Sequence, residues 1–479
     1  MTATAADIVS VLGVPGDATW TAACGAGASV PNAASPGLID CAATPWVPLS
    51  SCLHRVDIDT SAQGDPLATC SDGTPGVFYG RAGSGNDVDR WVIHLQGGGG
   101  CDDETSCQER WCGQQGIYDA AQMSNDWDAD GTIDRPLDMW LGGMTIDVPA
   151  NDFATWNHVY IPYCSSDTWL GRASDVDFDG TSAFTVDARG HKIVQTVRRM
   201  LRKRGYNSGW TFSDTTTLPD LDDATEIIFS GTSAGGVGAL QNADWFATPF
   251  SARTGLVVDG ALDISWNAAF SHGLYETGSG YSYYSFSHVR NEELWDPGGY
   301  YDEINAFVDQ SCMAVYPTAP HQCSSIPKLL LLASGGVPMI ETPLMLRFDL
   351  ADPVIASFFT TSPNPSGDEF VVGGLAGSTP TIDDFASMMR DSLVEYAADP
   401  QTNISVHAPK CGVHVGLELN NPTGVWTTPD SSDVPIPVDL GGDATAHDAI
   451  LEWFDPGSAG FTRIRRIDTD EPGVSFSSC

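Results

Sequence analysis

The sequence has few basic residues and almost no lysine. Its 22 Lys and Arg residues stand against 62 Asp and Glu residues, which gives a formal net charge of −40 at pH 7. The lysines are Lys192, Lys203, Lys328 and Lys410 only. A polyanion of this strength repels nucleic acids and anionic lipid headgroups. We therefore expect no nucleic-acid partner, and a surface that keeps the protein soluble in salt.

Long apolar runs and an export segment are also missing. No run approaches the ~20 apolar residues that a membrane-spanning helix needs. The longest apolar stretch, residues 329–333, fits a buried strand. The first ten residues, MTATAADIVS, contain neither the basic nor the apolar region of a signal peptide. We expect no membrane span, and any export signal has been removed or lies outside this sequence.

Zinc-type cysteine spacing is absent, although cysteine itself is not. The 12 cysteines are spread along the whole chain without a CxxC…CxxC pattern. An even number of dispersed cysteines is typical of disulfides formed in an oxidising compartment. The sequence therefore predicts a secreted or periplasmic protein.

The chain is rich enough in apolar residues to fold around a large core, with 42% hydrophobic residues. Residues 1–65, rich in Ala, Gly, Pro and Ser, predict an N-terminal extension that disulfides hold to the body. Residues 66–479 predict one large domain. Short apolar runs there alternate with amphipathic ones, which indicates an α/β fold with a mostly parallel central sheet flanked by helices. The predicted strands are 90–96, 158–163, 226–231, 255–262, 328–334 and 404–409; the predicted helices are 191–205, the stretch after Ser233, and 383–399.

The segment EIIFSGTSAGGVGAL contains a G-x-S-x-G motif centred on Ser233. It follows a predicted strand and precedes a small-residue helix, the context of a nucleophile elbow. Such a sharp turn needs glycine on both sides of the serine, because strand and helix come too close for a Cβ. The alternative is a glycine-rich turn without chemistry. We predict that Ser233 is a nucleophile and that the Ala234 amide faces a developing oxyanion.

A second glycine motif follows the predicted strand 90–96. Residues 97–100 are four consecutive glycines, which let backbone N–H groups point into a cavity without obstruction by side chains. Alone, such a run is more often a flexible turn. Together with Ser233 downstream, it predicts that Gly98 and Gly99 complete an oxyanion hole.

Four segments together resemble the pectin acetylesterase family, which also includes the Notum carboxylesterases. They are WVIHLQGGGGC, IPYCSSDTWLG (161–171), FSGTSAGGVGAL (229–240) and KCGVH (410–414). The resemblance implies an α/β-hydrolase fold and a Ser–His–Asp triad that acts on esters and needs no catalytic cofactor. It makes residues 66–479 the catalytic domain.

The triad histidine must follow Ser233 and the acid in this fold. His414 follows a predicted strand within Cys411-Gly412-Val413-His414, which matches the family pattern, and a disulfide at Cys411 would hold that loop. The competitor, His407, lies within a predicted strand, where a histidine is more often structural. We predict that His414 is the general base.

The acid has two candidates in LRFDLADPV (346–354). Alignment of the Phe-Asp pair with the family pattern favours Asp349, whereas Asp352 precedes Pro353 and fits the start of a turn. Asp259 and Asp263 follow an earlier strand and fit structural hydrogen bonding. The prediction is therefore a triad of Ser233, Asp349 and His414.

Two hexads have the spacing of calcium loops, in which alternate carboxylates surround a hard cation and glycine allows the bend. Neither is an EF-hand, since position 12 is Leu137 in one and Val186 in the other. In so acidic a chain, the pattern also arises as solvated surface. We predict structural calcium at these aspartates: Asp126, Asp128, Asp130 and Asp134 in the first loop, and Asp175, Asp177 and Asp179 in the second.

Three functions fit the sequence. The first is a monomeric secreted esterase that removes acetyl groups from a polysaccharide. In the second, the same residues cleave longer acyl chains or neutral polymeric esters. The third is a binding protein that keeps the fold without the chemistry. Because pectin is a polyanion, a net charge of −40 favours a neutral acylated carbohydrate over pectin.

Overall fold

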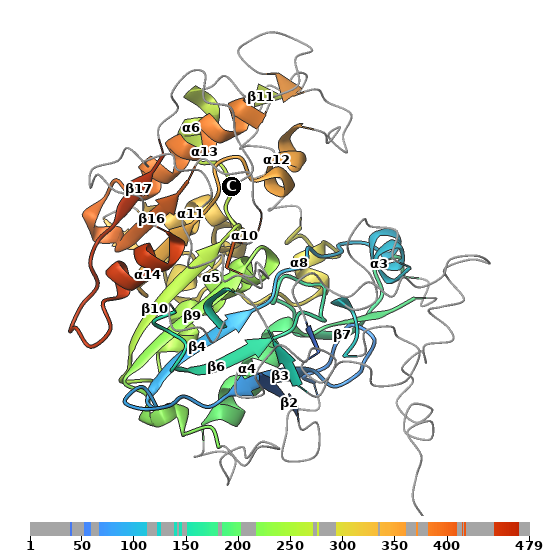
Figure 1. The fold of residues 1–479 in the computed structure, drawn as a ribbon. Coiled ribbons are helices and arrows are strands. Elements are labelled where there is room, and N and C mark those ends of the chain that lie inside the picture. The colour runs from blue at the N-terminus through green and yellow to red at the C-terminus, as the bar shows by residue number, and fades with distance from the viewer. Residues whose placement is uncertain are drawn as a thin grey trace, which may run out of the picture. The chain divides into compact units, whose positions relative to one another are not determined.

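The computed structural model (Figure 1) describes residues 39–40, 52–58, 67–112, 122–125, 138–140, 143–145, 151–180, 184–202, 217–271, 275–276, 294–333, 336–360, 370–371, 382–409, 414, 416–417 and 445–468. The chain divides into two compact units. The first comprises Met1–Leu141, Trp156–Ala224 and Trp295–Phe307, and the second Gly142–Thr155, Thr225–Leu294 and Val308–Cys479. Most of residues 1–65 lie outside the described residues, so the N-terminal extension stays a prediction.

The strands of the first unit are ordered β1-β5-β2-β3-β6-β4. All pairs are antiparallel except β6 with β4, which is parallel. Strand β4 confirms the strand predicted over 90–96, and β6 confirms the one predicted over 158–163. Their bounds are Ile39–Asp40 (β1), Leu53–Asp57 (β2), Val77–Arg81 (β3), Arg90–Leu95 (β4), Asp138–Trp140 (β5) and Asn157–Ile161 (β6).

The other elements of the first unit are a small hairpin and short helices. Helix α4 confirms the helix predicted over 191–205, although its described part ends earlier. The elements are α3 (Glu104–Trp111), β7 (Ala173–Val176), β8 (Val186–Ala188), α4 (Gly190–Leu201), the 3-10 helix η4 (Leu221–Asp223) and α8 (Tyr300–Glu303). Strand β7 pairs antiparallel with β8.

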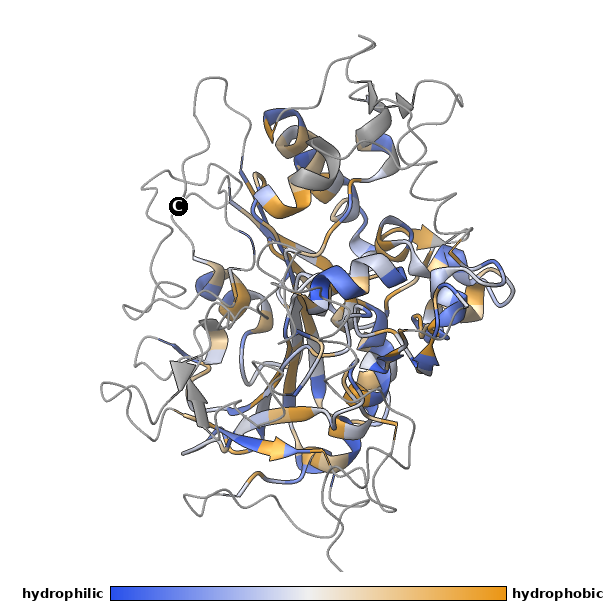
Figure 2. Ribbon diagram, turned by 90° about the vertical axis from the view of Figure 1, so that its right-hand side faces the viewer, coloured by the Kyte–Doolittle hydropathy of each residue, from blue (hydrophilic) through white to orange (hydrophobic). Residues whose placement is uncertain are grey.

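The second unit is built on parallel strands in the order β9-β10-β14-β16-β17. Every residue of β9, β14 and β16 is buried, as expected for parallel strands covered on both faces. In Figure 2, hydrophobic residues, coloured orange, occur along strands of the sheet. The bounds are Glu226–Thr232 (β9), Arg253–Asp259 (β10), Leu344–Arg347 (β14), Ile404–Ala408 (β16) and Arg465–Ile467 (β17).

Helices pack on these strands. Helix α5 contacts β9 and β10, α14 contacts β14 and β16, and α13 contacts β16 and β17. The elements are η3 (Gly143–Thr145), α5 (Ala234–Ala247), α6 (Trp266–Ser271), β11 (Tyr275–Glu276), α9 (Gln310–Val315), α10 (Pro320–Ser324), α11 (Ile326–Leu330), β12 (Leu332–Ala333), β13 (Val337–Pro338), α12 (Pro353–Thr360), β15 (Phe370–Val371), α13 (Ile382–Tyr396), η5 (Pro400–Thr402) and α14 (Ala446–Phe454). Among the described residues, no helix is both long and apolar enough to cross a bilayer.

The strand predicted over 328–334 is wrong. Residues 326–330 form helix α11, and only the two residues of β12 are extended. Pro327 lies in the first turn of the helix, where its missing N–H costs nothing and its φ suits a helix. The strand that precedes the candidate acids is instead β14, over LMLR.

Disulfides bear out the oxidised state that the cysteine pattern predicts. In the described residues, Cys70 is bonded to Cys164, Cys101 to Cys107, and Cys312 to Cys323. Cys52 and Cys112 are disulfide-bonded as well. The predicted disulfide at Cys411 lies outside the described residues.

A buried carboxyl group in the second unit has a perturbed proton affinity. Asp309 is 0% exposed, and its Oδ1 accepts a hydrogen bond from the Cys312 amide at the start of α9. Burial, followed by the negative charge of Asp244, raises the pKa of Asp309 from 3.8 to about 8. The folded protein therefore holds a proton on Asp309 at neutral pH that the unfolded chain has lost.

We expect Asp309→Asn to flatten the pH dependence of stability. Because the folded-state pKa is raised, the contribution of Asp309 is complete below about pH 4 and is lost as the pH rises towards about 8, at about 1.4 kcal/mol per pH unit. The amide keeps an oxygen for the Cys312 N–H and does not titrate. Urea denaturation across this range should give the variant a smaller loss of unfolding free energy than the wild type. Parallel curves would contradict the raised pKa.

Candidate active site

Ser233 lies at a sharp turn between the end of β9 and the start of α5. Its backbone has φ 51° and ψ −125°, a combination that a non-glycine residue adopts only when its surroundings impose it. The Ser233 amide donates to the Asp259 carbonyl at 2.8 Å. This is the strained strand-to-helix turn that the G-x-S-x-G motif predicts.

The glycines on both sides of Ser233 are required by close packing. A Cβ added to Gly231 would lie 2.1 Å from the Gly235 carbonyl oxygen, and one added to Gly236 would lie 2.5 Å from the Ala261 Cβ. At Gly231 and Gly235, strand β9 and helix α5 therefore meet through backbone. Ala234, the first residue of α5, is 5% exposed, and an amide at this position has no partner within the helix.

His414 is held by an aspartate of the same unit. Its Nδ1 lies 2.7 Å from Asp352 Oδ2, and the Asp352 side chain is 0% exposed. Its Nε2 is buried and has no hydrogen-bond partner among the described residues. An imidazole held at Nδ1 by a carboxylate, with Nε2 free, can accept a proton there.

The two candidate acids, Asp349 and Asp352, have different partners in the structure. Asp349 forms an ion pair with Arg347, whereas Asp352 contacts His414. Both aspartates follow β14, but the chain turns between them, and the Asp352 amide donates to the Asp349 carbonyl at 2.9 Å. That turn aims Asp352 rather than Asp349 at the histidine.

A signal for Asp352 was present in the sequence. Its Oδ1 accepts from the amides of Val354 and Ile355, so it caps the first turn of α12. An aspartate before proline at a helix start is a common N-cap pattern. One carboxylate oxygen thus caps the helix and the other meets the imidazole.

Asp259 connects the turn of Ser233 with the loop of His414. Its carbonyl accepts from the Ser233 amide, and its Oδ2 accepts from the Leu417 amide at 2.8 Å. Its Oδ1 accepts from Arg347 at 2.9 Å. The hydrogen-bonding role expected for Asp259 is therefore observed. His407 is fully buried within β16.

The four glycines lie in the first unit, after β4. Gly98 and Gly99 have φ values of 146° and 66°, which favour glycine. The carbonyl of Gly98 accepts from the buried Arg110 at 2.5 Å. Arg110 also donates to Ser166 Oγ, and the Ser166 carbonyl accepts from the Cys101 amide. The loop is thus held from both ends, and its part in an oxyanion hole stays a prediction.

Asp167, within the motif IPYCSSDTWLG of the first unit, is surrounded by backbone amides. The Asp167 carboxylate accepts hydrogen bonds from the amides of Trp169 and Gly171 in the motif and of Gly190 outside it. A Cβ at Gly171 or Gly190 would lie 2.3 Å from a carboxylate oxygen. Burial nevertheless raises the pKa of Asp167 to about 6, despite these donors.

Calcium at the second aspartate hexad is not supported. No group of three or more His, Cys, Asp or Glu side chains in the described ranges is placed to hold a metal ion. Asp175 has φ 51°, and the pairing of β7 with β8 is irregular there, which breaks the alternation of side chains along the strand. The first hexad and Asp134 lie outside the described residues.

Comparison with known proteins supports the family resemblance. Residues 56–263 match the family model described as Pectinacetylesterase. Pectin acetylesterase 11 of Arabidopsis thaliana is 28% identical over 222 residues, covering 46% of this chain and 47% of that protein. Palmitoleoyl-protein carboxylesterase notum1a of Danio rerio is 30% identical over 202 residues, covering 41% of this chain and 34% of that protein. The chain thus spans about a third to a half of these curated relatives.

The fold is also that of a solved relative. The Wnt deacylase Notum from Drosophila matches with a TM-score of 0.57 and 23% identity, over 86% of this chain and 96% of that one. The structure therefore has the α/β-hydrolase fold that the sequence predicts.

We expect Gly231→Ala to destabilise the second unit. The added methyl would meet the Gly235 carbonyl oxygen at 2.1 Å, a backbone contact that cannot move without opening the elbow. The unfolding free energy should fall by about 3 kcal/mol. Gly460→Ala, where nothing lies within 4 Å of the new methyl, serves as the control and should change little. Equal stabilities in chemical denaturation would show that the elbow tolerates a Cβ.

Proposed function

We propose that this chain, which carries a pectinacetylesterase domain over residues 56–263, is a serine carboxylic-ester hydrolase. The observation that carries the proposal is the 2.7 Å contact of His414 Nδ1 with Asp352 Oδ2, in the same unit as the strained Ser233. A serine in an elbow and an aspartate-held histidine that follows it are the parts of a hydrolase triad.

The proposed reaction runs through an acyl-enzyme. Ser233 Oγ attacks the ester carbonyl while His414 Nε2 takes its proton, and the protonated imidazole then gives that proton to the leaving alcohol. Water repeats the attack on the acyl-enzyme and releases the acid. Asp352 holds the imidazole tautomer and stabilises the imidazolium. The amides of Ala234, Gly98 and Gly99 remain the proposed donors to the oxyanion.

The proposed substrate is an acetylated polysaccharide. The names of the relatives supply both alternatives: pectin acetylesterase indicates acetyl groups on a glycan, and palmitoleoyl-protein carboxylesterase indicates a long acyl chain. The net charge of −40 opposes binding of polyanionic pectin, so a neutral acetylated glycan is favoured. The proposed reaction uses no cofactor, and we propose a monomer.

The proposed compartment is the cell exterior or the periplasm. Its support is the set of disulfides in the described residues, one of which closes a loop of 94 residues. Such bonds persist in oxidising compartments and are rare in the cytosol.

We expect Ser233→Ala to abolish ester hydrolysis and leave the fold intact. The change removes only the attacking hydroxyl, and the backbone constraint on residue 233 comes from its neighbours. Hydrolysis of p-nitrophenyl acetate and circular dichroism provide the measurements. The exposed Ser251 offers the matched control, Ser251→Ala, which should keep full activity. Near-native activity in Ser233→Ala would disprove the proposed mechanism, whereas a wild type without activity on any ester would leave the non-catalytic alternative.

We expect Asp352→Asn to lower kcat by about 10⁴-fold, because an amide favours the wrong imidazole tautomer. Asp349→Asn should cost far less, because Asp349 pairs with Arg347. Comparing kcat for the two variants on the same ester decides between the two aspartates. The reverse order would return the acid role to Asp349.

We expect the wild type to prefer short acyl chains on a neutral glycan. A panel of p-nitrophenyl esters from acetyl to palmitoyl, run beside acetylated xylan and pectin, measures both preferences. Release of acetate from xylan should exceed that from pectin at low salt, and added salt should narrow the difference by screening repulsion. A preference for palmitoyl would favour the second alternative.

A further inference from the structure

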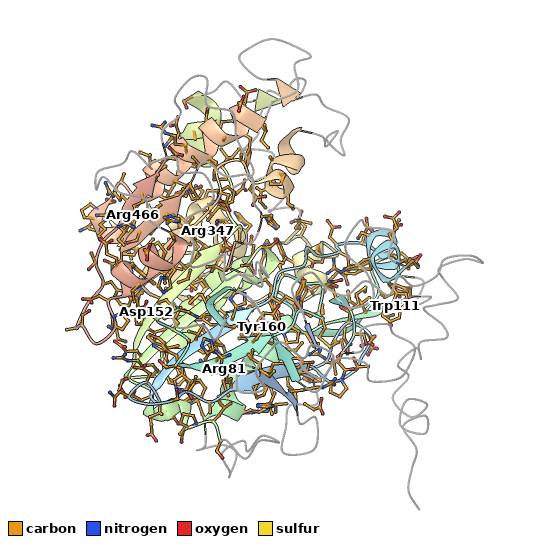
Figure 3. All side chains as sticks on the ribbon, viewed as in Figure 1. Arg81, Trp111, Asp152, Tyr160, Arg347 and Arg466 are labelled. Carbon is orange, nitrogen blue, oxygen red and sulfur yellow. A yellow bond between two sulfur atoms is a disulfide. The ribbon has the colours of Figure 1, made fainter. Side chains whose placement is uncertain are left out.

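Arg347 is a buried arginine at the carboxyl end of β14, and the motifs of the sequence do not point to it. It is 3% exposed, and its position in the second unit is labelled in Figure 3. In the parallel sheet it lies in register with Asp259 of β10 on one side and His407 of β16 on the other. The segments that carry Ser233, Asp352 and His414 follow the carboxyl ends of β9, β14 and β16, at this same end of the parallel strands.

The first contact of Arg347 is with Asp259, which is hydrogen-bonded to the nucleophile turn. Arg347 Nη1 donates to Asp259 Oδ1 at 2.9 Å, and both side chains are almost completely buried. Asp259 in turn accepts the Ser233 amide on its carbonyl and the Leu417 amide on its other carboxylate oxygen. The ion pair therefore fixes the residue on which the elbow and the histidine loop are both anchored.

The second contact is with Asp349, which is hydrogen-bonded to the proposed acid, Asp352. Arg347 pairs with Asp349, which is 1% exposed, and the Asp349 carbonyl accepts the Asp352 amide. Asp352 then holds His414. Because the guanidinium group pairs with Asp349, it fixes the position of the first residue of the turn that leads to Asp352.

The third contact reaches the histidine loop directly. A Cβ added to Gly416 would lie 2.3 Å from Arg347 Cζ and within 2.5 Å of both terminal nitrogens. The backbone of the loop, two residues after His414, therefore lies against the guanidinium group. A side chain at position 416 would push the loop away.

We propose that Arg347 is the positioning residue that sets the mutual geometry of Ser233, Asp352 and His414; the inference rests on the proposed function. Its guanidinium stays charged, and Nη1 contacts both carboxylates. The group is also planar, so its flat surface can lie against the backbone at Gly416 while Nη1 holds the carboxylates. The ammonium of lysine is a point charge on a flexible stem and cannot reproduce this arrangement. In this proposal Arg347 acts through Asp259, Asp349 and Gly416.

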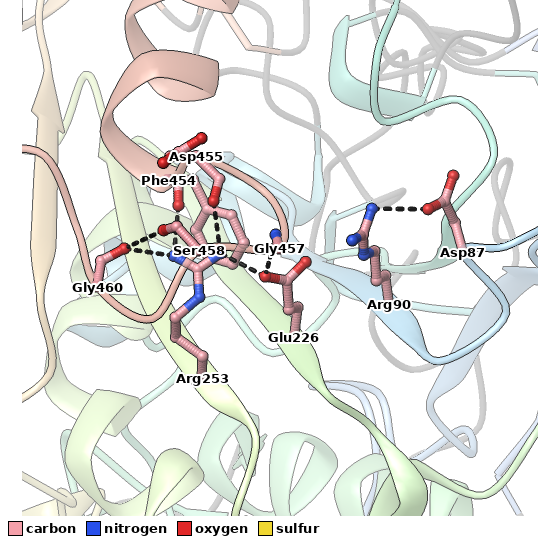
Figure 4. Close-up of polar contacts among 9 residues, drawn as sticks. All are labelled: Asp87, Arg90, Glu226, Arg253, Phe454, Asp455, Gly457, Ser458 and Gly460. Atoms are coloured by element: carbon pink, nitrogen blue, oxygen red, sulfur yellow. Dashed lines mark hydrogen bonds and ion pairs between the residues drawn. The ribbon is translucent and has the colours of Figure 1, made fainter.

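The first test is Arg347→Lys, assayed on p-nitrophenyl acetate well below its melting temperature. A displacement of about 1 Å in the triad should lower kcat by about 100-fold and leave KM within about twofold. The matched control is Arg253→Lys. Arg253 begins β10, at the end of that strand opposite Asp259, and pairs with Glu226 while donating to the carbonyls of Phe454 and Gly460 (Figure 4). This control should lose stability and keep kcat.

The second test needs no turnover. The proton between His414 Nδ1 and Asp352 should give a low-field resonance in proton NMR, assigned by its loss in His414→Gln. This resonance should shift or disappear in Arg347→Lys and persist in Arg253→Lys. Failure of the proposed function would appear as full activity in Ser233→Ala, whereas failure of this inference would appear as an unchanged resonance and kcat in folded Arg347→Lys.

Gly416→Ala keeps the proposal testable if Arg347→Lys does not fold. The added methyl meets the guanidinium and should lower kcat and perturb the same resonance. In the double variant, the lysine removes the planar group, so the two effects should be less than additive. The proposal is overturned if folded Gly416→Ala keeps both kcat and the resonance, if the two effects are fully additive, or if Arg253→Lys loses as much kcat as Arg347→Lys.

Discussion

The backbone strain at Ser233 is the constraint around which the second unit is arranged. A serine at φ 51° and ψ −125° costs free energy of order 1–3 kcal/mol, which the packing around it must supply. That packing requires glycine at two close approaches, Gly231 of β9 against Gly235 of α5, and Gly236 of α5 against Ala261, which follows β10. It also requires the Asp259 carbonyl to accept the Ser233 amide. The buried parallel strands beneath the elbow supply this rigidity, because their backbones are held on both sides by neighbouring strands.

Buried charge extends this rigidity to the rest of the site. Arg347 carries one positive charge between Asp259 and Asp349, all within the described second unit. Burying such groups is costly unless each is paired and hydrogen-bonded, and removing one partner would leave an uncompensated charge. The arrangement is therefore more important for fixing geometry than for adding stability. The buried carboxylate of Asp352 also fixes geometry through two contacts, because one oxygen caps α12 and the other contacts His414.

The scarcity of basic residues makes their placement informative. Of the 22 Lys and Arg residues, several are buried: Arg81, Arg110, Arg189 and Arg347 are each less than 8% exposed. Positive charge is thus used to hold loops and strand ends in the interior, as Arg110 does at Gly98. With a net charge of −40, the surface is nevertheless strongly acidic. Such a surface repels polyanions, and salt weakens that repulsion.

The sequence alone determined the parts of this protein that depend on local pattern. Alternating strands and helices indicated the parallel sheet, and glycines around a serine after a strand indicated the elbow, because both follow from backbone sterics within a few residues. The sequence of the helix at 326–330 also fits a strand, because a short apolar run has no distinguishing period and only Pro327 marks the difference. Which of Asp349 and Asp352 lies against His414 depends on tertiary structure. Both follow β14 within a few residues, and the position of His414, 62 residues beyond Asp352 in the chain, determines which carboxylate meets the imidazole. Contacts between residues far apart in sequence leave no local pattern to read, which is why Arg347 and Gly416 emerged only from the folded chain.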